Sequence, residues 1–283
     1  MTGGERTSGV VLAVHRALPD LVFVPAEDVL LHEECDPERV ARLCRRLQQE
    51  GVLKNPPVAA RLESRVVVLD GANRTEALRT LGARTILLQQ VDYEDPAVEL
   101  RTWRHLVTDA PPDLERRLRE LLPLERMESR EAAQALEQGR ILAYLRRPGG
   151  TLVLPRGADL PEDVARLREL VSLYKGAGRI HRVLSEDPER LAGEYGEAGM
   201  LVAFPTFTKR EILEMAHNGV KLPTGITRHV IPGRALRVNM PLERMLREES
   251  LQALQMWLHS WMREKVRNHE VRYYAESTFL FDE

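Results

Sequence analysis

Apolar and polar residues recur along the first hundred residues in a way that predicts a compact unit of helices and short strands. Residues 36–51 have helical spacing, with Asp36 suited to the N-cap, Pro37 to the first turn and Gly51 to the end. One face of this helix carries Val40, Leu43, Cys44 and Leu47. A second helix is predicted over residues 74–82. Short apolar runs predict strands at residues 10–19, 21–31, 55–71 (two strands around a turn near Glu63) and 84–93.

The second half of the chain mixes longer helices with strands. Pro111 and Pro112 precede a charged amphipathic stretch, which indicates a domain boundary near residue 110. Helices are predicted at residues 111–122, 129–139 with Ser129 as N-cap, 161–174, 208–219 with Thr208 as N-cap, and 241–269 with Trp257 and Trp261 on one face. Strands are predicted at residues 141–147 and 150–156, as a hairpin, and at 200–207. We therefore expect an α+β fold with an N-terminal domain at residues 1–110 and a mixed helical and strand domain at residues 111–283.

Composition narrows the class of protein. Of the 283 residues, 43% are apolar and 30% are charged, as in a soluble globular chain. The net charge of -2 disfavours a dedicated nucleic-acid binder. We expect no export signal, because the N-terminal residues lack a basic-then-apolar layout, and no apolar run has the length of a membrane helix. Cys35 and Cys44 fit neither a disulfide framework nor a zinc pattern. The expected location is a reducing cytoplasm, while the oligomeric state is left open.

The stretch VVVLDGANRTEAL, residues 66–78, places several polar residues at one strand-to-helix corner. Gly71 allows a tight turn and a close approach of phosphate to the first-turn N–H groups, where the helix dipole favours an anion. Arg74 is suited to bind phosphate oxygens with paired donors, Asn73 to donate or accept, and Asp70 to hold Mg²⁺. These residues indicate a nucleotide-phosphate site.

A purely structural interpretation of the same residues is also open. Asp-Gly is common in turns, and in this interpretation Asp70 caps the helix while Arg74 pairs with an acid such as Glu76.

The order of elements over roughly residues 20–95 resembles the ParB/sulfiredoxin fold. That superfamily has a helix ending in Gly, then Pro, two strands, and D-G-x-x-R at the start of a helix that closes with Leu-Gly, as in residues 51–93. The resemblance implies phosphate contacts at Asp70, Gly71, Ala72, Asn73 and Arg74. Lys54, in LKNP, is a further candidate contact, with an exposed loop lysine as the alternative.

Within the superfamily the chain is most similar to the free L-serine kinases. Sulfiredoxins need a cysteine beside the corner, where this chain has Asn73, and ParB proteins add a recognition helix that is not clear here. The similarity to the kinases lies in residues 30–40 (LLHEECDPERV), 52–78 and 222–243. These kinases use ATP or ADP to convert L-serine to O-phospho-L-serine, for cysteine or siderophore-precursor synthesis.

The resemblance to the kinases also implies residue roles. In LLHEECD it makes Glu33 the expected catalytic base, with Glu34 as the alternative. Asp70 is expected to assist catalysis by holding Mg²⁺.

Free serine has a carboxylate and an ammonium group that must be held, and TGITRH offers groups suited to this. Arg228 or His229 is suited to clamp the carboxylate, and Thr227 to donate a hydrogen bond. The resemblance favours Thr227 and His229 and adds Trp103 as a wall of the serine pocket. A structural loop and a core tryptophan are the alternatives. The active site is expected in a cleft between the two domains.

A ParB-like regulator, whose nucleotide site controls DNA binding without catalysis, is the alternative function. The basic stretch RHVIPGRALR, residues 228–237, is its candidate DNA contact, although a solvated or phosphate-facing strand explains the stretch better. The expected partners are therefore L-serine and an adenine nucleotide, with DNA not favoured and no membrane.

Overall fold

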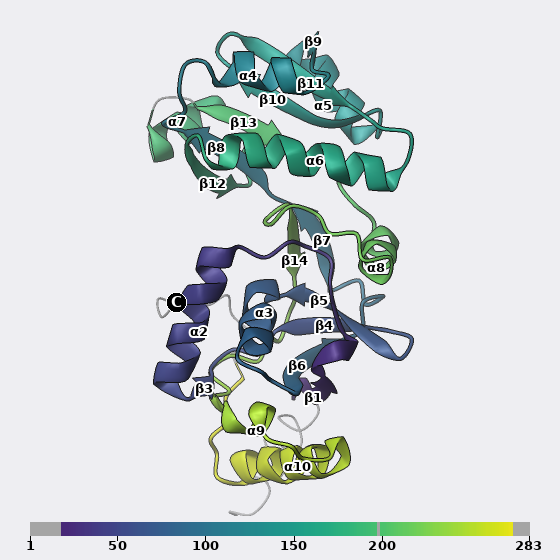
Figure 1. Cartoon of the computed structure of the whole chain (residues 1–283), viewed down its shortest axis with the longest axis vertical. Coiled ribbons are helices and arrows are strands. Elements are labelled where there is room, and N and C mark those ends of the chain that lie inside the picture. Colours follow the sequence, from purple (N-terminus) through teal and green to yellow (C-terminus); the bar gives the residue numbers. More distant parts are fainter. Residues whose placement is uncertain (1–17, 197–198, 274–283) are drawn as a thin grey trace, which may run out of the picture. The chain divides into compact units, whose positions relative to one another are not determined.

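The computed structural model describes residues 18–196 and 199–273 and divides into two compact units (Figure 1). The first unit holds the described residues up to Leu30, the stretch Cys35–Val98, and the described residues from Ile231 onward. The second holds Leu31–Glu34 and Glu99–Val230. The expected mixture of helices and strands is confirmed.

A five-stranded sheet in the order β1-β6-β4-β5-β2 forms the centre of the first unit. Its strands are β1 (Asp20–Pro25), β2 (Val29–Leu31), β4 (Val58–Leu62), β5 (Arg65–Asp70) and β6 (Thr85–Val91). A short pair joins β3 (Val52–Leu53) to β15 (Met240–Pro241). The helices are η1 (Ala26–Asp28), α2 (Pro37–Glu50), α3 (Ala72–Thr80), α9 (Glu243–Leu246) and α10 (Leu251–Arg267).

Helix α2 begins and ends as its sequence predicts. The Asp36 carboxylate accepts a hydrogen bond from the N–H of Arg39, Pro37 lies in the first turn, and Gly51 ends the helix with φ of 67°. Cys44 and Leu47 are buried on its inner face. Contacts between α2 and α3 then place the start of α3 beside the start of α2.

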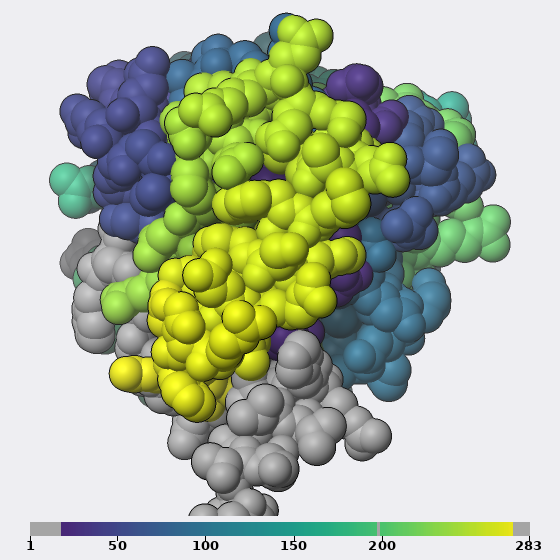
Figure 2. Space-filling view, turned by 90° about the horizontal axis from the view of Figure 1, so that it is seen from below, coloured from purple at the N-terminus to yellow at the C-terminus, as the bar shows by residue number. Residues whose placement is uncertain are grey.

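The C-terminal segment belongs to the first unit, which differs from the expected boundary near residue 110. Met240 pairs with Leu53, and the N–H of Arg84 donates to the carbonyl of Met245. Helix α10 lies along β1, where the Gln255 side chain donates to the Phe23 carbonyl, and Figure 2 shows this segment in yellow across the face seen from below. The side chains of Met245, Leu254 and Leu258 are fully buried. Because the apolar face of a helix must be removed from water, these side chains explain why the C-terminal segment packs against the first unit.

A six-stranded sheet in the order β12-β8-β13-β10-β11-β9 forms the second unit. Its strands are β8 (Arg104–Thr108), β9 (Glu125–Met127), β10 (Ile141–Arg147), β11 (Gly150–Pro155), β12 (Arg179–Val183) and β13 (Met200–Ala203). The helices are α4 (Leu114–Leu121), α5 (Ser129–Glu137), α6 (Leu160–Lys175), α7 (Pro188–Tyr195) and α8 (Lys209–His217). A separate pair joins β7 (Glu99–Thr102) to β14 (Thr227–Val230).

Successive side chains of a strand point to opposite faces of this sheet, and different helices cover the two faces. Leu152 and Leu154 of β11 pack in one cluster with residues of α4 and α6, whereas Val153 packs with α5. The predicted hairpin of β10 and β11 is confirmed.

Two local predictions were wrong. Glu128, rather than Ser129, caps α5, because its carboxylate accepts from the N–H groups of Arg130 and Glu131 while the Ser129 hydroxyl bonds to Thr151. The long helix predicted at residues 241–269 is two helices, α9 and α10, and the Ser250 side chain caps the second.

Some of the other local predictions are confirmed, and one lies almost wholly outside the described residues. Thr208 caps α8 in a reciprocal capping box with Glu211. Trp257 and Trp261 stack with ring centroids 6.1 Å apart, as expected for one helix face. The strand predicted at residues 10–19 lies almost wholly outside the described residues. Within the described part of the chain, no helix has the length and apolar character needed to span a membrane.

Candidate functional site

The corner between β5 and α3 depends on Gly71. Its φ of 98° lies in the left-handed region, where a side chain is strained. A Cβ atom at this position would also lie 2.9 Å from Cβ of Pro57 and 3.0 Å from a terminal nitrogen of Arg74. The N-cap of α3 is Gly71, which has no side chain to bond the first-turn N–H groups, and such N–H groups can donate to an anion.

Asp70 forms ion pairs with two arginines from distant parts of the sequence. Its Oδ2 atom lies 2.8 Å from Nη2 of Arg74 and also accepts from Arg234. Arg74 thus pairs with an acid, as the structural interpretation also expected, and that acid is Asp70, four residues earlier in the chain. One carboxylate thus brings two guanidinium groups together at the start of α3.

The other residues of the corner hold the chain that enters α2. Asn73 Oδ1 accepts from the N–H of Asp36 at 2.8 Å, and the Cys35 thiol donates to the Ala72 carbonyl at 3.5 Å. The first turn of α3 and the residues just before α2 are therefore fixed to each other.

Lys54 lies in the first unit at the start of the segment that leads to β4. Its ammonium group donates to Glu50 at 2.8 Å. Hydrogen bonds from Lys54 and then Arg46 hold the pKa of Glu50 below its ordinary value. The Lys54 carbonyl accepts from the N–H of Val238, so this lysine also anchors the C-terminal segment.

In the second unit, Glu33 is held by three hydrogen-bond donors. Its Oε1 accepts from the N–H of Thr227 at 2.8 Å and from the Thr227 hydroxyl at 2.6 Å. Its Oε2 accepts from the N–H of Gly225 at 3.0 Å. Since a carboxylate has about four acceptor positions, one remains, and it lies on Oε2.

His32 extends this arrangement. Its Nε2 lies 2.9 Å from the Thr227 hydroxyl oxygen. The only proton of that hydroxyl goes to Glu33, which accepts and cannot donate while ionised, so His32 Nε2 carries a proton and donates to Thr227. The His229 ring meets the His32 ring edge-on, with centroids 5.4 Å apart.

Strand β14 separates the predicted serine-binding residues onto two faces. Thr227 and His229 are two residues apart and share a face with His32, whereas the Arg228 guanidinium lies over the Trp103 ring, 4.6 Å from its centroid. The Trp103 N–H donates to the carbonyl of Ile226. The structure therefore groups Thr227 and His229 with Glu33, and Arg228 with Trp103.

Glu34, the alternative base, has different surroundings. Its carboxylate forms an ion pair with Arg168, and its N–H donates to the carbonyl of Leu222. Glu34 therefore has a charged partner, whereas Glu33 accepts from the neutral donors of Gly225 and Thr227.

A buried histidine supports the loop that holds Glu33. His105 Nε2 lies 3.0 Å from the Gly225 carbonyl and Nδ1 lies 2.7 Å from the Tyr174 hydroxyl. Because a carbonyl only accepts, Nε2 carries the proton and Nδ1 accepts from Tyr174. Burial lowers the pKa of His105 to about 4, so the ring is neutral at pH 7.

Comparison with curated proteins finds four similar L-serine kinases. The chain is 24% identical over 265 residues to the ATP-dependent L-serine kinase SbnI of Staphylococcus aureus, covering 93% of this chain and 97% of that protein. It is 24% identical to the ADP-dependent L-serine kinase SerK of Thermococcus kodakarensis, covering 80% of this chain and 93% of that protein. The resemblance to the free L-serine kinases is confirmed.

Solved structures share this fold. A C-terminally truncated SbnI from Staphylococcus aureus matches with a TM-score of 0.69 and 20% identity, covering 89% of this chain and 98% of that one. A free serine kinase in complex with AMP also matches with a TM-score of 0.69, at 24% identity, covering 81% of this chain and 94% of that one. No family model matches the chain.

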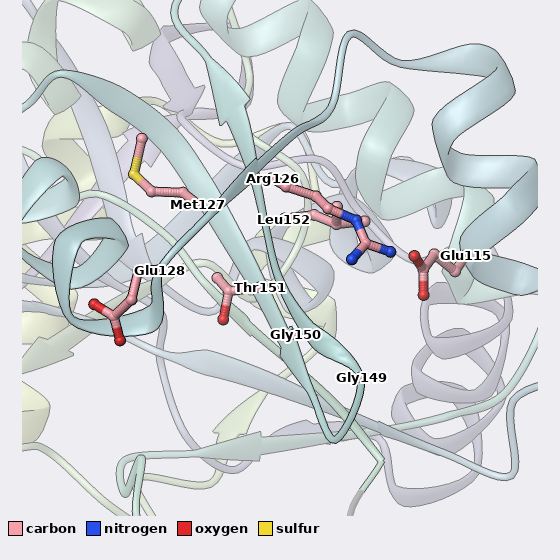
Figure 3. Close-up of a pocket in the computed structure, with 8 residues that line it drawn as sticks. All are labelled: Glu115, Arg126, Met127, Glu128, Gly149, Gly150, Thr151 and Leu152. Carbon is pink, nitrogen blue, oxygen red and sulfur yellow. The ribbon is translucent and has the colours of Figure 1, made fainter.

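A pocket of about 290 Å³ opens elsewhere in the second unit (Figure 3). It is lined by Glu115, Arg126, Met127, Glu128, Gly149, Gly150, Thr151 and Leu152. Figure 3 shows Arg126 pointing toward Glu115, and none of the predicted site residues lines this pocket. It therefore takes no part in the candidate site.

Sequence reasoning missed His32, His105 and Arg234. His32 directly precedes Glu33, so its position was a usable signal. Arg234 lies in the basic stretch of residues 228–237, but 164 residues separate it from Asp70. His105 has no local sequence signal, because its partners are contributed by α6 and by the loop before β14.

Proposed function

We propose that this protein is a free L-serine kinase, which transfers a phosphoryl group from ATP or ADP to the hydroxyl of L-serine and forms O-phospho-L-serine. The observation that carries the proposal is similarity over nearly the full length of a curated L-serine kinase, 97% of it. Relatives named as ATP-dependent and as ADP-dependent kinases have the same identity to this chain, so both donors are proposed.

Glu33 is proposed as the base. As the serine oxygen bonds to the terminal phosphorus, the hydroxyl proton passes to the Glu33 carboxylate and the bond to the bridging phosphate oxygen breaks. The remaining acceptor position on Oε2 supports this role. The donors from Thr227 and Gly225 orient the carboxylate before the substrate arrives.

The corner at Asp70 is proposed as the phosphate site. Arg74, the N–H groups of Gly71, Ala72 and Asn73, and Lys54 would bind the nucleotide phosphates. Support comes from the absence of a side-chain cap on α3 and from the Gly71 backbone. The similarity to an L-serine kinase, which covers 93% of this chain, supports assigning both clusters to one reaction.

Mg²⁺ is proposed as the accompanying metal, and Asp70 would hold it. Among the described residues there is no cluster of three or more His, Cys, Asp or Glu side chains suited to a metal. Mg²⁺ can be held by one carboxylate, substrate phosphates and water, and Asp70 would take this role once Arg74 and Arg234, its partners here, bind the phosphates instead. The metal would neutralise charge on the phosphoryl group during transfer.

The serine contacts are proposed as Thr227 and His229 on one face of β14, with Arg228 and Trp103 as further candidates. The Thr227 hydroxyl proton is used by Glu33, so its role toward serine would be indirect or through its remaining acceptor capacity. A ParB/sulfiredoxin-like first unit, a cleft for the active site and a cytoplasmic location remain predictions from the sequence.

The function is tested by incubating the purified protein with Mg²⁺, L-serine and either ATP or ADP, and measuring O-phospho-L-serine by mass spectrometry. We expect product with at least one donor and none without serine. A protein that forms no phosphoserine but shifts DNA in a gel would instead support the regulator, which no described feature favours.

A further inference from the structure

Gln89 fixes a short piece of the C-terminal segment on the sheet of the first unit. Its side-chain Nε2 donates to the Gly233 carbonyl at 3.0 Å, and its Oε1 accepts from the Ala235 N–H at 2.8 Å. The two bonds are made to the residues directly before and after Arg234. They resemble the pair of hydrogen bonds that one residue of an antiparallel strand exchanges with its neighbour. Gln89 is only 4% exposed, so it is a rigid anchor.

The register of the sheet explains why this anchor serves Asp70. Val58 on β4 lies opposite Gln89 on β6 and also opposite Asp70 on β5. Gln89 and Asp70 therefore lie on one row across three adjacent strands, and the segment held by Gln89 brings Arg234 to the Asp70 carboxylate.

Charge at this point favours an anion. Arg74 and Arg234 share the single carboxylate of Asp70, so the three side chains together carry a formal charge of +1. They lie at the N-terminus of α3, whose dipole also favours negative charge. Arg234 keeps a third of its side chain exposed, 33%, which leaves donors accessible to a ligand.

The geometry points to Arg234 as a second guanidinium ligand of the nucleotide's phosphates, with Gln89 as its positioning residue. Asp70 is the acceptor for both guanidinium groups in the free protein, and a polyphosphate provides stronger acceptors for them. This inference rests on the proposed function, because it assigns the phosphates of the donor to the Asp70 corner.

Calorimetric titration of the full-length protein with Mg²⁺–ADP and, separately, with adenosine tests the inference without turnover. Arg234→Ala is expected to weaken ADP binding about tenfold to a hundredfold and to leave adenosine binding unchanged, because adenosine has no phosphate. Gln89→Met, similar in length and apolar, is expected to weaken ADP binding by a smaller factor, about threefold to tenfold.

Arg84→Ala is the matched control, since Arg84 is an ion-paired arginine of the same unit, bonded to Glu248. It is expected to bind ADP as the wild type does. Wild-type ADP affinity in Arg234→Ala, equal losses for ADP and adenosine, or a wild-type protein that binds no ADP would each overturn the inference. A wild type that binds ADP but forms no phosphoserine would instead remove the proposed kinase function and leave Arg234 as a phosphate ligand.

Discussion

Glu33 combines two properties that a catalytic carboxylate requires. Backbone N–H groups at Gly225 and Thr227 hold it in one orientation, and those donors cannot rotate away as a flexible side chain could. One acceptor position on Oε2 still remains for a substrate proton. The neighbouring Glu34 has an arginine partner instead, so adjacent and chemically identical residues have different surroundings.

Glu33→Gln is expected to lower kcat for phosphoserine formation at least about a hundredfold, because an amide does not accept the hydroxyl proton as a carboxylate does. Initial rates measured by mass spectrometry test this. Glu34→Gln is the control and should stay within a few-fold of the wild type. Similar losses in both variants would contradict the assignment of the base.

His105 is expected to make stability depend on pH between about 4 and about 6.5. The pKa of the buried ring, about 4, lies below its ordinary value of 6.5, so the unfolded chain binds more protons in this window. The free energy of unfolding therefore rises with pH there, by about 1.4 kcal/mol per pH unit, and about 3 kcal/mol is lost as the pH falls through the window.

Urea unfolding of the wild type and of His105→Gln from pH 4 to pH 7.5 measures this dependence. The difference between the two proteins should shrink as the pH falls, because glutamine does not titrate. A difference that is constant with pH would show that His105 does not titrate in this way.

At the scale of elements, the β5–α3 corner depends on backbone geometry as much as on charge. Gly71 brings the first turn of α3 against Pro57, and the Asp36–Asn73 bond ties this turn to the start of α2. The position of Arg74 thus depends on the geometry of this turn. We therefore expect a change in the turn to weaken binding of the nucleotide.

Gly71→Ala is expected to destabilise the protein by about 1–3 kcal/mol and to raise KM for the nucleotide, because the new Cβ meets Pro57 and Arg74. Thermal unfolding and steady-state kinetics measure the two effects. Gly82→Ala is the control: its φ is 83°, but nothing lies within 4 Å of the new Cβ. It should cost stability through backbone strain and leave KM unchanged, and equal KM changes in both variants would count against a local role of Gly71.

At the scale of the whole molecule, the chain builds its first unit from segments at both ends of the sequence. The buried side chains of α9 and α10 belong to that unit, while residues 99–230 form the second unit with its own apolar core.

Leu254→Ala is expected to lower the stability of the first unit by about 2–4 kcal/mol, since Leu254 is fully buried. Hydrogen exchange should become faster in β1 and β6 and stay unchanged in β10 and β13. Leu167→Ala, which removes an equally buried side chain from α6, should give the reverse pattern. Faster exchange in the second unit after Leu254→Ala would contradict the assignment of α10.

The predictions that succeeded rest on local signals. The cap and stop of α2, the turn between β4 and β5 and the hairpin of β10 and β11 each depend on residues within one short stretch. The Glu128 cap was missed because a competing contact, between Ser129 and Thr151, lies 22 residues away in sequence. The break between α9 and α10 was missed although a local signal exists: the polar run at residues 247–250 interrupts the apolar spacing and ends in Ser250, the N-cap of α10.

The sequence by itself determined the elements, the D-G-x-x-R corner and the resemblance to the serine kinases, since these depend on residue order and local backbone preference. Only the tertiary structure decided that Glu33 meets Thr227, that Asp70 meets Arg234, and that the C-terminal helix packs with the N-terminal strands. The physical reason is that these contacts join residues 164 to 232 positions apart, and burial and hydrogen bonding over such separations follow from the packing of whole elements rather than from neighbouring residues.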